Sequence, residues 1–311
     1  MKVKIKQNLL KFNMPRRIVQ FLFFIFFSAV IFNLSSLPLL LPVLGTWGLQ
    51  KNIVGDAFTT IQLMLSGWNV PNVAFPWLAI ASFLIIGILI GKSLCGWICP
   101  FGFIQELIGL IRRKKAEISP RTHLSMLYIK YIILGITLFI SVTFSAAKLA
   151  GVSRSYENAL GVFAEAPFTA LSPAETLFAT LPTMVRDFSN ATSANQIDFL
   201  SGIASLPPLF WIQLFIMGSV LVFAAYVPRS WCKYFCPHGA IMAVLNRFSF
   251  LGLRRDLVKC AKGECRLCVE ACPMRVPILE LPWEKFSDPE CIYCLRCADA
   301  CPHGAIKLKY P

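Results

Sequence analysis

Charged residues are scarce in this 311-residue chain. They make up only 15% of it, while 56% of the residues are hydrophobic. A soluble domain of this length would carry more charge, so the composition points to membrane spans. Acidic residues are the scarcest, 16 against 30 Lys and Arg, which gives a formal net charge of +14. The basic residues lie beside apolar runs rather than on one face of a soluble domain, which argues against nucleic-acid binding.

Histidine is also rare, and the three that occur do not form a pair within any apolar stretch. A haem held by two histidines of this chain is therefore not expected. His123 is expected at the membrane interface. His238 and His303 lie in two identical Cys-Pro-His-Gly-Ala-Ile stretches, where a polar residue at a helix start is the simpler interpretation. No segment resembles a signalling output domain, which argues against a redox sensor.

Four stretches are apolar enough to cross a bilayer core of roughly 30 Å, which takes about 20 helical residues. They cover about 18–44, 75–94, 124–147 and 209–227. The first follows a basic tail, as a signal peptide would, but it is too long and lacks a clear small-residue cleavage site. We expect it to be retained as an anchor.

The distribution of Lys and Arg predicts the orientation of these spans. Basic residues gather in the N-terminal tail, after the second span and after the fourth span. Since basic loops stay in the cytoplasm, we expect a multi-pass protein of the inner (cytoplasmic) membrane with both termini cytoplasmic. The other two loops carry only Lys51, Lys148, Arg154 and Arg186.

Polar and aromatic residues near the span ends have ordinary interpretations. Lys92 and Lys130 lie near cytoplasmic ends, where lysine side chains commonly snorkel to the interface. The same holds for the tryptophans that cluster near predicted boundaries and fit an aromatic belt, which are Trp47, Trp68, Trp77, Trp97, Trp211 and Trp231.

None of the 12 cysteines lies outside a closely spaced group. Spacings of two to four residues favour metal ligation over disulfides, and the predicted topology places every thiol on the reducing cytoplasmic side. The groups are Cys95 and Cys99; Cys232 and Cys236; Cys260, Cys265, Cys268 and Cys272; and Cys291, Cys294, Cys297 and Cys301.

The two C-terminal groups resemble the bacterial ferredoxin run, in which three closely spaced thiolates bind one 4Fe-4S cluster and a fourth, before proline, binds the other. One cluster would then take Cys260, Cys265, Cys268 and Cys301. The other would take Cys272, Cys291, Cys294 and Cys297. Zinc is the alternative for such spacings. The first interval has two extra residues, which leaves room for a 3Fe-4S cluster or an altered potential.

The remaining cysteines form two C-x3-C-P motifs, each directly after a span. Residues i and i+4 share a helix face, so each motif can present two thiolates together. Cys95, Cys99, Cys232 and Cys236 could therefore hold a third, shared 4Fe-4S cluster at the membrane face. A structural pair without redox activity and two separate pairs without metal remain alternatives.

The recurrence of span and motif indicates an internal repeat. Two parallel halves would be related by an approximate two-fold axis along the membrane normal. The predicted fold is an α-helical membrane protein with four transmembrane helices in two parallel repeats, followed by an α+β two-cluster ferredoxin domain. The predicted domains are 1–254 and 255–311.

This combination of spans, C-x3-C-P motifs and terminal ferredoxin run resembles the NapH/MauN group of ferredoxin-type membrane proteins. The wider polyferredoxin family includes NosR and CcoG types. The segments 95–102, 232–239 and 260–302 carry the resemblance. It implies electron transfer between the quinone pool and a periplasmic or membrane redox partner, as a quinol dehydrogenase component. The alternative that it implies is an electron-supplying maturation factor for a periplasmic metalloenzyme. The direction of flow, the quinone site and the partner subunits are left open.

Overall fold

The computed structural model describes residues 12–31, 77–112, 116, 118–161, 171–181, 184–185, 208–260 and 265–310. The chain forms two compact units. One comprises Met1–Phe26, Phe83–Ile133 and Ala224–Pro311, and the other comprises Phe27–Ser82 and Leu134–Phe223. All 12 cysteines lie in the first unit.

Two helices in the described part of the chain are long and apolar enough to cross a membrane. They are the Pro120–Phe144 part of α8 (Pro120–Leu149), with a mean hydropathy of 1.9, and α14 (Pro208–Tyr226), with a mean hydropathy of 2.0. Only 22% and 28% of these two windows are buried. The core helix of a soluble protein would bury most of its length, so the exposed apolar side chains suit contact with lipid.

The other two predicted spans are only partly visible. Helix α2 (Asn13–Ile31) covers the start of the predicted span 18–44, whose remainder lies outside the described residues. Helix α5 (Trp77–Ile90) has 14 residues and is uniformly apolar, but this is shorter than the roughly 20 residues that a full crossing takes. The four-span arrangement therefore stays a prediction.

Each C-x3-C-P motif folds in the same way after its apolar helix. Helix α6 (Ser93–Trp97) and helix α15 (Ser230–Tyr234) are short, and each contains the first cysteine of a motif. The second cysteine, Cys99 or Cys236, is the N-cap of the next helix, α7 (Pro100–Ile111) or α16 (Pro237–Asn246). The expectation of two cysteines on one continuous helix face was wrong, because proline suits the first turn of a new helix and breaks the old one.

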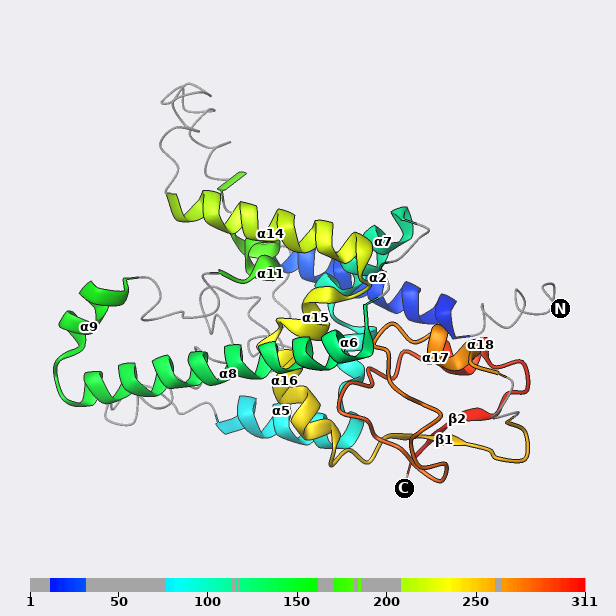
Figure 1. Ribbon diagram of the computed structural model, residues 1–311. Helices are drawn as coiled ribbons and strands as arrows, with labels where there is room; N and C mark the ends of the chain where they lie inside the picture. The colour runs from blue at the N-terminus through cyan, green and yellow to red at the C-terminus, as the bar shows by residue number, and fades with distance from the viewer. Residues whose placement is uncertain are drawn as a thin grey trace. The chain divides into compact units, whose positions relative to one another are not determined.

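The C-terminal segment wraps around a buried core. Strand β1 (Gly252–Arg255) pairs antiparallel with β2 (Ile306–Lys309), with Leu253 opposite Leu308. The short helices α17 (Leu267–Glu270) and α18 (Arg296–Ala300) each carry one cysteine of a ferredoxin run, Cys268 or Cys297, and Figure 1 shows them beside this small sheet. Apolar residues and cysteines share the core, among them Leu253, Phe286, Ile292, Tyr293, Cys294 and Cys297.

Only part of the second unit lies among the described residues. Its described elements are α9 (Ser153–Leu160), α11 (Pro173–Glu175), a π-helical turn at Thr176–Thr180, and the larger parts of α8 and α14. No cysteine lies here, so the candidate chemistry belongs to the first unit.

Candidate metal centres

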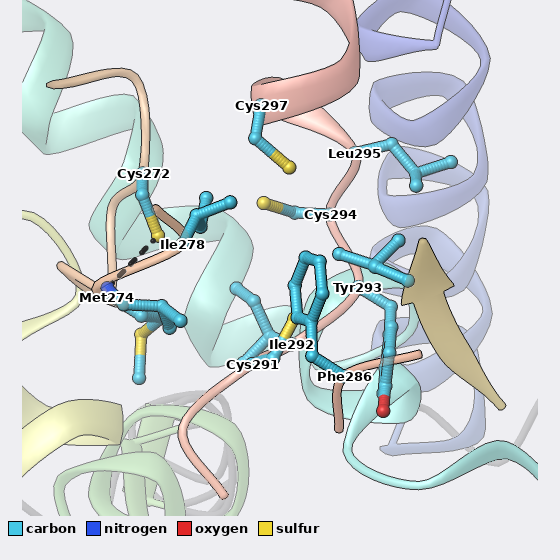
Figure 2. A pocket seen from close by; sticks show the side chains of 12 residues that line it. Cys272, Met274, Ile278, Phe286, Cys291, Ile292, Tyr293, Cys294, Leu295 and Cys297 are labelled. Atoms are coloured by element: carbon cyan, nitrogen blue, oxygen red, sulfur yellow. Dashed lines mark hydrogen bonds between the residues drawn. The ribbon is translucent and has the colours of Figure 1, made fainter. Parts of the chain in front are cut away.

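Four cysteines surround one apolar cavity in the C-terminal segment, which we call the second cysteine cavity. Figure 2 shows them, with the Cys272 side chain on one wall and the Cys294 and Cys297 sulfurs pointing toward each other on another. The rest of the lining is apolar side chains and Tyr293. The backbone N–H of Val276 donates to Cys272 Sγ at 3.4 Å. The four cysteines are Cys272, Cys291, Cys294 and Cys297.

The other four cysteines of this segment line a separate cavity, the first cysteine cavity. Arg255 and His303 also line it. The N–H of Ala305 donates to Cys301 Sγ at 3.3 Å, four residues after the cysteine as in the second cavity. Both Cys-Pro turns therefore offer a hydrogen bond to their own sulfur. The four cysteines are Cys260, Cys265, Cys268 and Cys301.

Each cavity thus combines three cysteines of one run with the pre-proline cysteine of the other. This is the grouping that the spacing predicts, while cluster ligation itself stays a prediction. Among the described residues, no three Cys, His, Asp or Glu side chains are arranged to hold one metal ion. A cubane binds its four thiolates at four different irons, so its ligands lie farther apart than those of a single zinc ion.

The four C-x3-C-P cysteines also come together, at what we call the paired-motif site. Cys99 and Cys232, one cysteine from each motif, lie close enough for their side chains to interact. The neighbouring Cys99 lowers the pKa of Cys232 against the effect of burial, helped by Arg229 and by Gln105. Burial raises the pKa of Cys95 to about 12, and the charges of Cys232 and Cys236 contribute. All four sulfurs are therefore electrostatically coupled.

Contacts across the repeat hold this site together in both directions. Gln105, on the helix after the first motif, donates to Cys232 Sγ at 3.3 Å and accepts from the Trp231 N–H at 3.1 Å. Arg229, just before the second motif, donates to the Cys95 carbonyl at 2.6 Å. The Cys232 thiol and the Cys95 backbone are thus each held by a residue of the opposite half.

The glycines of the two motifs pack equivalently. A Cβ at Gly102 would lie 3.4 Å from the Cys95 carbonyl, and one at Gly239 would lie 3.0 Å from the Cys232 carbonyl. The new helix therefore approaches the preceding turn closely in both motifs, and at Gly239 a side chain would have little room. This explains the shared C-P-x-G pattern.

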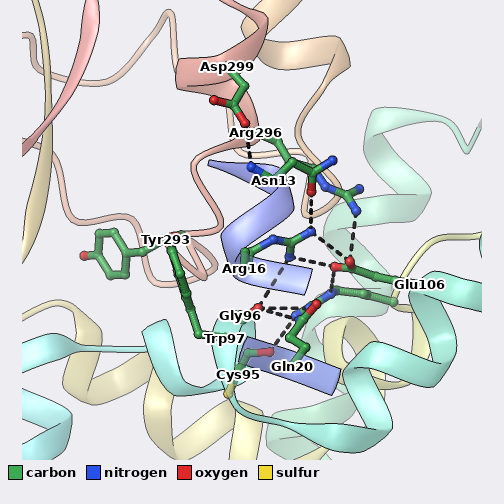
Figure 3. Close-up of polar contacts among 11 residues, drawn as sticks. Asn13, Arg16, Gln20, Cys95, Gly96, Trp97, Glu106, Tyr293, Arg296 and Asp299 are labelled. Carbon is green, nitrogen blue, oxygen red and sulfur yellow. Dashed lines mark hydrogen bonds and ion pairs between the residues drawn. The ribbon is translucent and has the colours of Figure 1, made fainter. Parts of the chain in front are cut away.

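A buried carboxylate, Glu106, joins three distant segments (Figure 3). It accepts from Arg16 at 3.0 and 2.8 Å, from Arg229 at 2.6 Å and from Arg296 at 2.9 Å. Burial favours the neutral carboxyl, but Arg229, Arg296 and Arg16 together hold the pKa of Glu106 well below its usual range. One carboxylate faces three guanidinium groups, so the interior keeps an excess of positive charge.

The first C-x3-C-P motif packs directly on the loop that forms the second cysteine cavity. A Cβ at Gly96 would lie only 2.2 Å from the Ile292 carbonyl oxygen. Trp97 Nε1 donates to the Tyr293 carbonyl at 2.9 Å, and Gln20 Nε2 donates to the Gly96 carbonyl at 2.7 Å. Cys95 and Trp97 belong to the packing around the second cavity, so the two candidate sites share a wall.

A second buried charge cluster lies beside the same loop. Glu290, the residue before Cys291, pairs with Lys92 at 2.9 Å and with Lys130. Both lysines are 1% exposed or less, so the expectation that they snorkel to the interface was wrong. Lys92 stands three residues before Cys95, as Arg229 does before Cys232. Equivalent positions of the two motifs therefore both hold a cation, and each cation pairs with a different carboxylate.

Two of the tryptophans and one histidine near the span ends also differ from expectation. Trp97 donates a hydrogen bond within the protein, and Trp231 is buried against Phe101 and Phe235 rather than facing lipid. His123 is not an exposed interfacial residue. It is buried, and its Nδ1 lies 2.8 Å from the Tyr234 hydroxyl.

Sequence reasoning missed both acidic residues that organise these contacts. Glu106 is a lone carboxylate in an apolar helix, a pattern that predicts a buried cationic partner. Glu290 directly precedes a ferredoxin cysteine and carries no comparable signal. The partners of these two residues could not be predicted from the sequence, because the paired residues are 90 to 198 positions apart.

Comparison with known proteins identifies both kinds of cysteine motif. The family described as "4Fe-4S binding domain" matches residues 73–119 and 209–256, one match around each C-x3-C-P motif. The family described as "4Fe-4S dicluster domain" matches residues 259–306. The first family matches twice, while the repeat arrangement of the fold stays a prediction. No solved structure is significantly similar to this chain.

Relatives cover most of the chain at low identity. YccM of Escherichia coli, a candidate electron transport protein, is 24% identical over 84% of this chain, which spans 60% of that relative's length. The ferredoxin-type protein NapH of Escherichia coli is 24% identical over 86% of this chain and 82% of its own. The methylamine utilization ferredoxin-type protein MauN of Methylobacillus flagellatus is 24% identical, covering 82% and 74%. NirI and NosR proteins also match, so the expected resemblance is confirmed.

Proposed function

We propose that this chain, a ferredoxin-type electron-transport protein related to NapH and MauN, carries electrons between the quinone pool and a redox partner through three 4Fe-4S clusters. The single observation that carries the proposal is the close packing of Gly96 on Ile292. It brings the paired-motif site against the second cysteine cavity, and so connects the membrane side of the protein with the ferredoxin core.

The cysteine cavities suit iron–sulfur clusters chemically. Each offers four thiols in an otherwise mostly apolar lining, and one cysteine of each already accepts a backbone N–H. Hydrogen bonds to sulfur and low solvent exposure are among the features that set cluster potentials. When bound, such clusters supply one-electron carriers. The chain's own residues hold them at fixed positions and exclude water.

Buried positive charge supports a third cluster at the paired-motif site. The three arginines around Glu106 and the two lysines on Glu290 outnumber their carboxylates. Uncompensated buried charge costs several kcal/mol. The Arg229 guanidinium interacts with Cys232 of the paired-motif site and with Cys294 of the second cavity. A cluster held by four thiolates is a net anion, so clusters at these two sites would balance the excess.

The packing suggests an order for electron transfer. The paired-motif site adjoins the second cysteine cavity through Cys95 and Trp97. Burial raises the pKa of Cys297, and neighbouring thiols raise it further, among them Cys268 of the first cavity. The two cavities are therefore also close to each other. Electrons would pass between quinone, paired-motif site, second cavity and first cavity, in either direction.

The membrane location also enters the proposal. Helices α5 and α14 end at Ile90 and Tyr226, just before the two motifs. With both termini cytoplasmic, the paired-motif site would lie at the cytoplasmic face of a multi-pass inner-membrane protein, within reach of a quinone in the bilayer. The partner would be a periplasmic or membrane protein.

Reduction by quinol tests this function. Full-length protein in lipid nanodiscs is mixed anaerobically with a short-chain quinol, and cluster reduction is followed by electron paramagnetic resonance. The clusters of both cysteine cavities are expected to become reduced in the wild type. In Cys99→Ser they are expected to stay oxidised with quinol yet become reduced with dithionite.

The result also separates the proposal from its alternative. If quinol leaves the wild-type clusters oxidised while dithionite reduces them, and added short-chain quinone does not reoxidise the dithionite-reduced clusters, the quinone link is refuted. A maturation factor supplied by another electron donor would then be favoured. If Cys99→Ser responds to quinol as the wild type does, the paired-motif site is not on the path.

A further inference from the structure

Strand β1 covers both cysteine cavities with one of its faces. Leu253 and Arg255 are two residues apart, so their side chains point to the same side of the strand. Leu253 lines the second cysteine cavity, and Arg255 lines the first. Arg254, between them, points to the opposite side and is exposed. The strand therefore places an apolar side chain over the second cavity and a cation over the first.

The Arg255 side chain is buried and only partly satisfied. It is 2% exposed, and its Nη1 donates to the Ile278 carbonyl at 2.9 Å. Its Nε has no hydrogen-bond partner among the described residues. In the same part of the chain, no ion pair joins Arg255 to a carboxylate. A buried guanidinium with a free N–H is costly unless it meets an anionic acceptor.

The cavity supplies that acceptor if it holds the proposed cluster. We infer that Arg255 donates a hydrogen bond to the cluster of the first cysteine cavity, or to one of its thiolates, and raises its reduction potential. The inference rests on the proposed function, which places a cluster there. Adding an electron makes the cluster more negative, and a nearby cation with a donor N–H stabilises the reduced state more than the oxidised state.

The contrast with the second cavity indicates which cluster Arg255 affects. Among the described residues no charged side chain lines that cavity, and Leu253 occupies the corresponding place on β1. Arg255 therefore acts on one cluster of the pair. It is a positioning residue that sets how strongly the first cluster holds its electron, and it is not a ligand.

The test is a redox titration of full-length protein followed by electron paramagnetic resonance. Arg255→Met removes the charge and the donor but keeps a long side chain. We expect the first cluster to be reduced at least tenfold less favourably, which corresponds to about 59 mV for one electron. The second cluster should keep its potential. Arg254→Met, on the outer side of the same strand, is the matched control and should shift neither cluster.

Other outcomes decide against the inference or against its premise. Iron content is measured on each variant, and a Cys265→Ser variant assigns the signals. Unchanged potentials in Arg255→Met with full iron content would overturn the role of Arg255, as would equal shifts in both clusters. If Arg255→Met loses the first cluster, Arg255→Lys decides. Lysine keeps the charge but loses the planar donor. A decrease in the reduction potential of the first cluster that is smaller than the decrease expected for Arg255→Met supports the inference, and an unchanged potential overturns it. A wild type without a cluster in the first cavity would instead refute the proposed function.

Discussion

Replacing Glu106 with Gln removes the charge that joins three arginines while keeping the shape of the side chain. The carboxylate accepts four hydrogen bonds, at 3.0 and 2.8 Å from Arg16, 2.6 Å from Arg229 and 2.9 Å from Arg296. Gln can accept through one oxygen, and its amide would face a guanidinium. Removing one partner of a buried ion pair costs roughly 3–5 kcal/mol. Because three cations lose their counter-charge together, we expect Glu106→Gln to lower the free energy of unfolding by about this amount.

The assay is urea unfolding of the full-length protein in detergent, followed by tryptophan fluorescence. Trp97 lies at the affected contact and reports on it. Glu270→Gln is the control, because Glu270 is exposed and a surface change should stay within about 0.5 kcal/mol. An effect of Glu106→Gln no larger than the control would refute the idea that this network holds the ferredoxin core against the first motif.

The same network predicts a pH dependence with a definite sign. The pKa of Glu106 is held below its ordinary value of 4.5 against burial, by Arg229, Arg296 and Arg16. Its contribution is therefore complete above that value and is lost as the pH falls below it toward the folded-state pKa. The difference in unfolding free energy between wild type and Glu106→Gln should be constant at neutral pH and shrink in acid. A difference that stayed constant through the acid range would contradict the assignment.

Three further predictions follow from the topology, the cavities and the close packing. Reporter fusions after positions 60, 115, 180 and 311 should report outside, inside, outside and inside, and an external C-terminus would contradict the predicted orientation. Cys272→Ser should remove the cluster signal of the second cysteine cavity, although this residue belongs to the first run, and loss of only the other signal would refute the exchange of ligands. Gly96→Ala should destabilise the protein by about 1–3 kcal/mol in the same urea assay, because its Cβ would lie 2.2 Å from the Ile292 oxygen, whereas Gly135→Ala, with nothing within 4 Å, should have little effect.

The grouping of the ferredoxin cysteines could be predicted because it depends on local spacing. Two residues between cysteines fix three thiols around one cavity, and the proline after Cys272 or Cys301 turns the fourth toward the other cavity. The structure places all eight cysteines in the two groups that this reasoning gives. The spacing within each run is local, whereas the exchange of the pre-proline cysteines is what the resemblance to the bacterial ferredoxin run implies.

The surroundings of the sites could not be predicted in this way. Lys92 near a span end has the same local sequence signal whether it snorkels to water or pairs with Glu290, 198 residues later. The positive-inside pattern likewise counted Arg16 and Arg229 as topology signals, while the structure buries both around Glu106. These outcomes depend on which segments meet in space, and composition alone does not contain that information.

The helix geometry of the C-x3-C-P motif was predicted incorrectly for a local reason. Spacing i to i+4 suggested one continuous helix, but Pro100 and Pro237 each begin a new helix with the preceding cysteine as its N-cap. The second cysteine then lies at a helix N-terminus, where the Cys236 sulfur accepts the backbone N–H of Gly239 at 3.4 Å. The proline that follows each motif was the signal for this break.

The iron content of the full-length protein tests the central claim most directly. With clusters in both cysteine cavities and at the paired-motif site, anaerobically purified wild type should contain about twelve irons and as many sulfides. Cys99→Ser and Cys236→Ser should each lower this to about eight, and the double variant should be no lower, because one cluster is shared by both motifs. A wild type with about eight irons, or single variants in which the other motif keeps its own metal, would contradict the shared cluster.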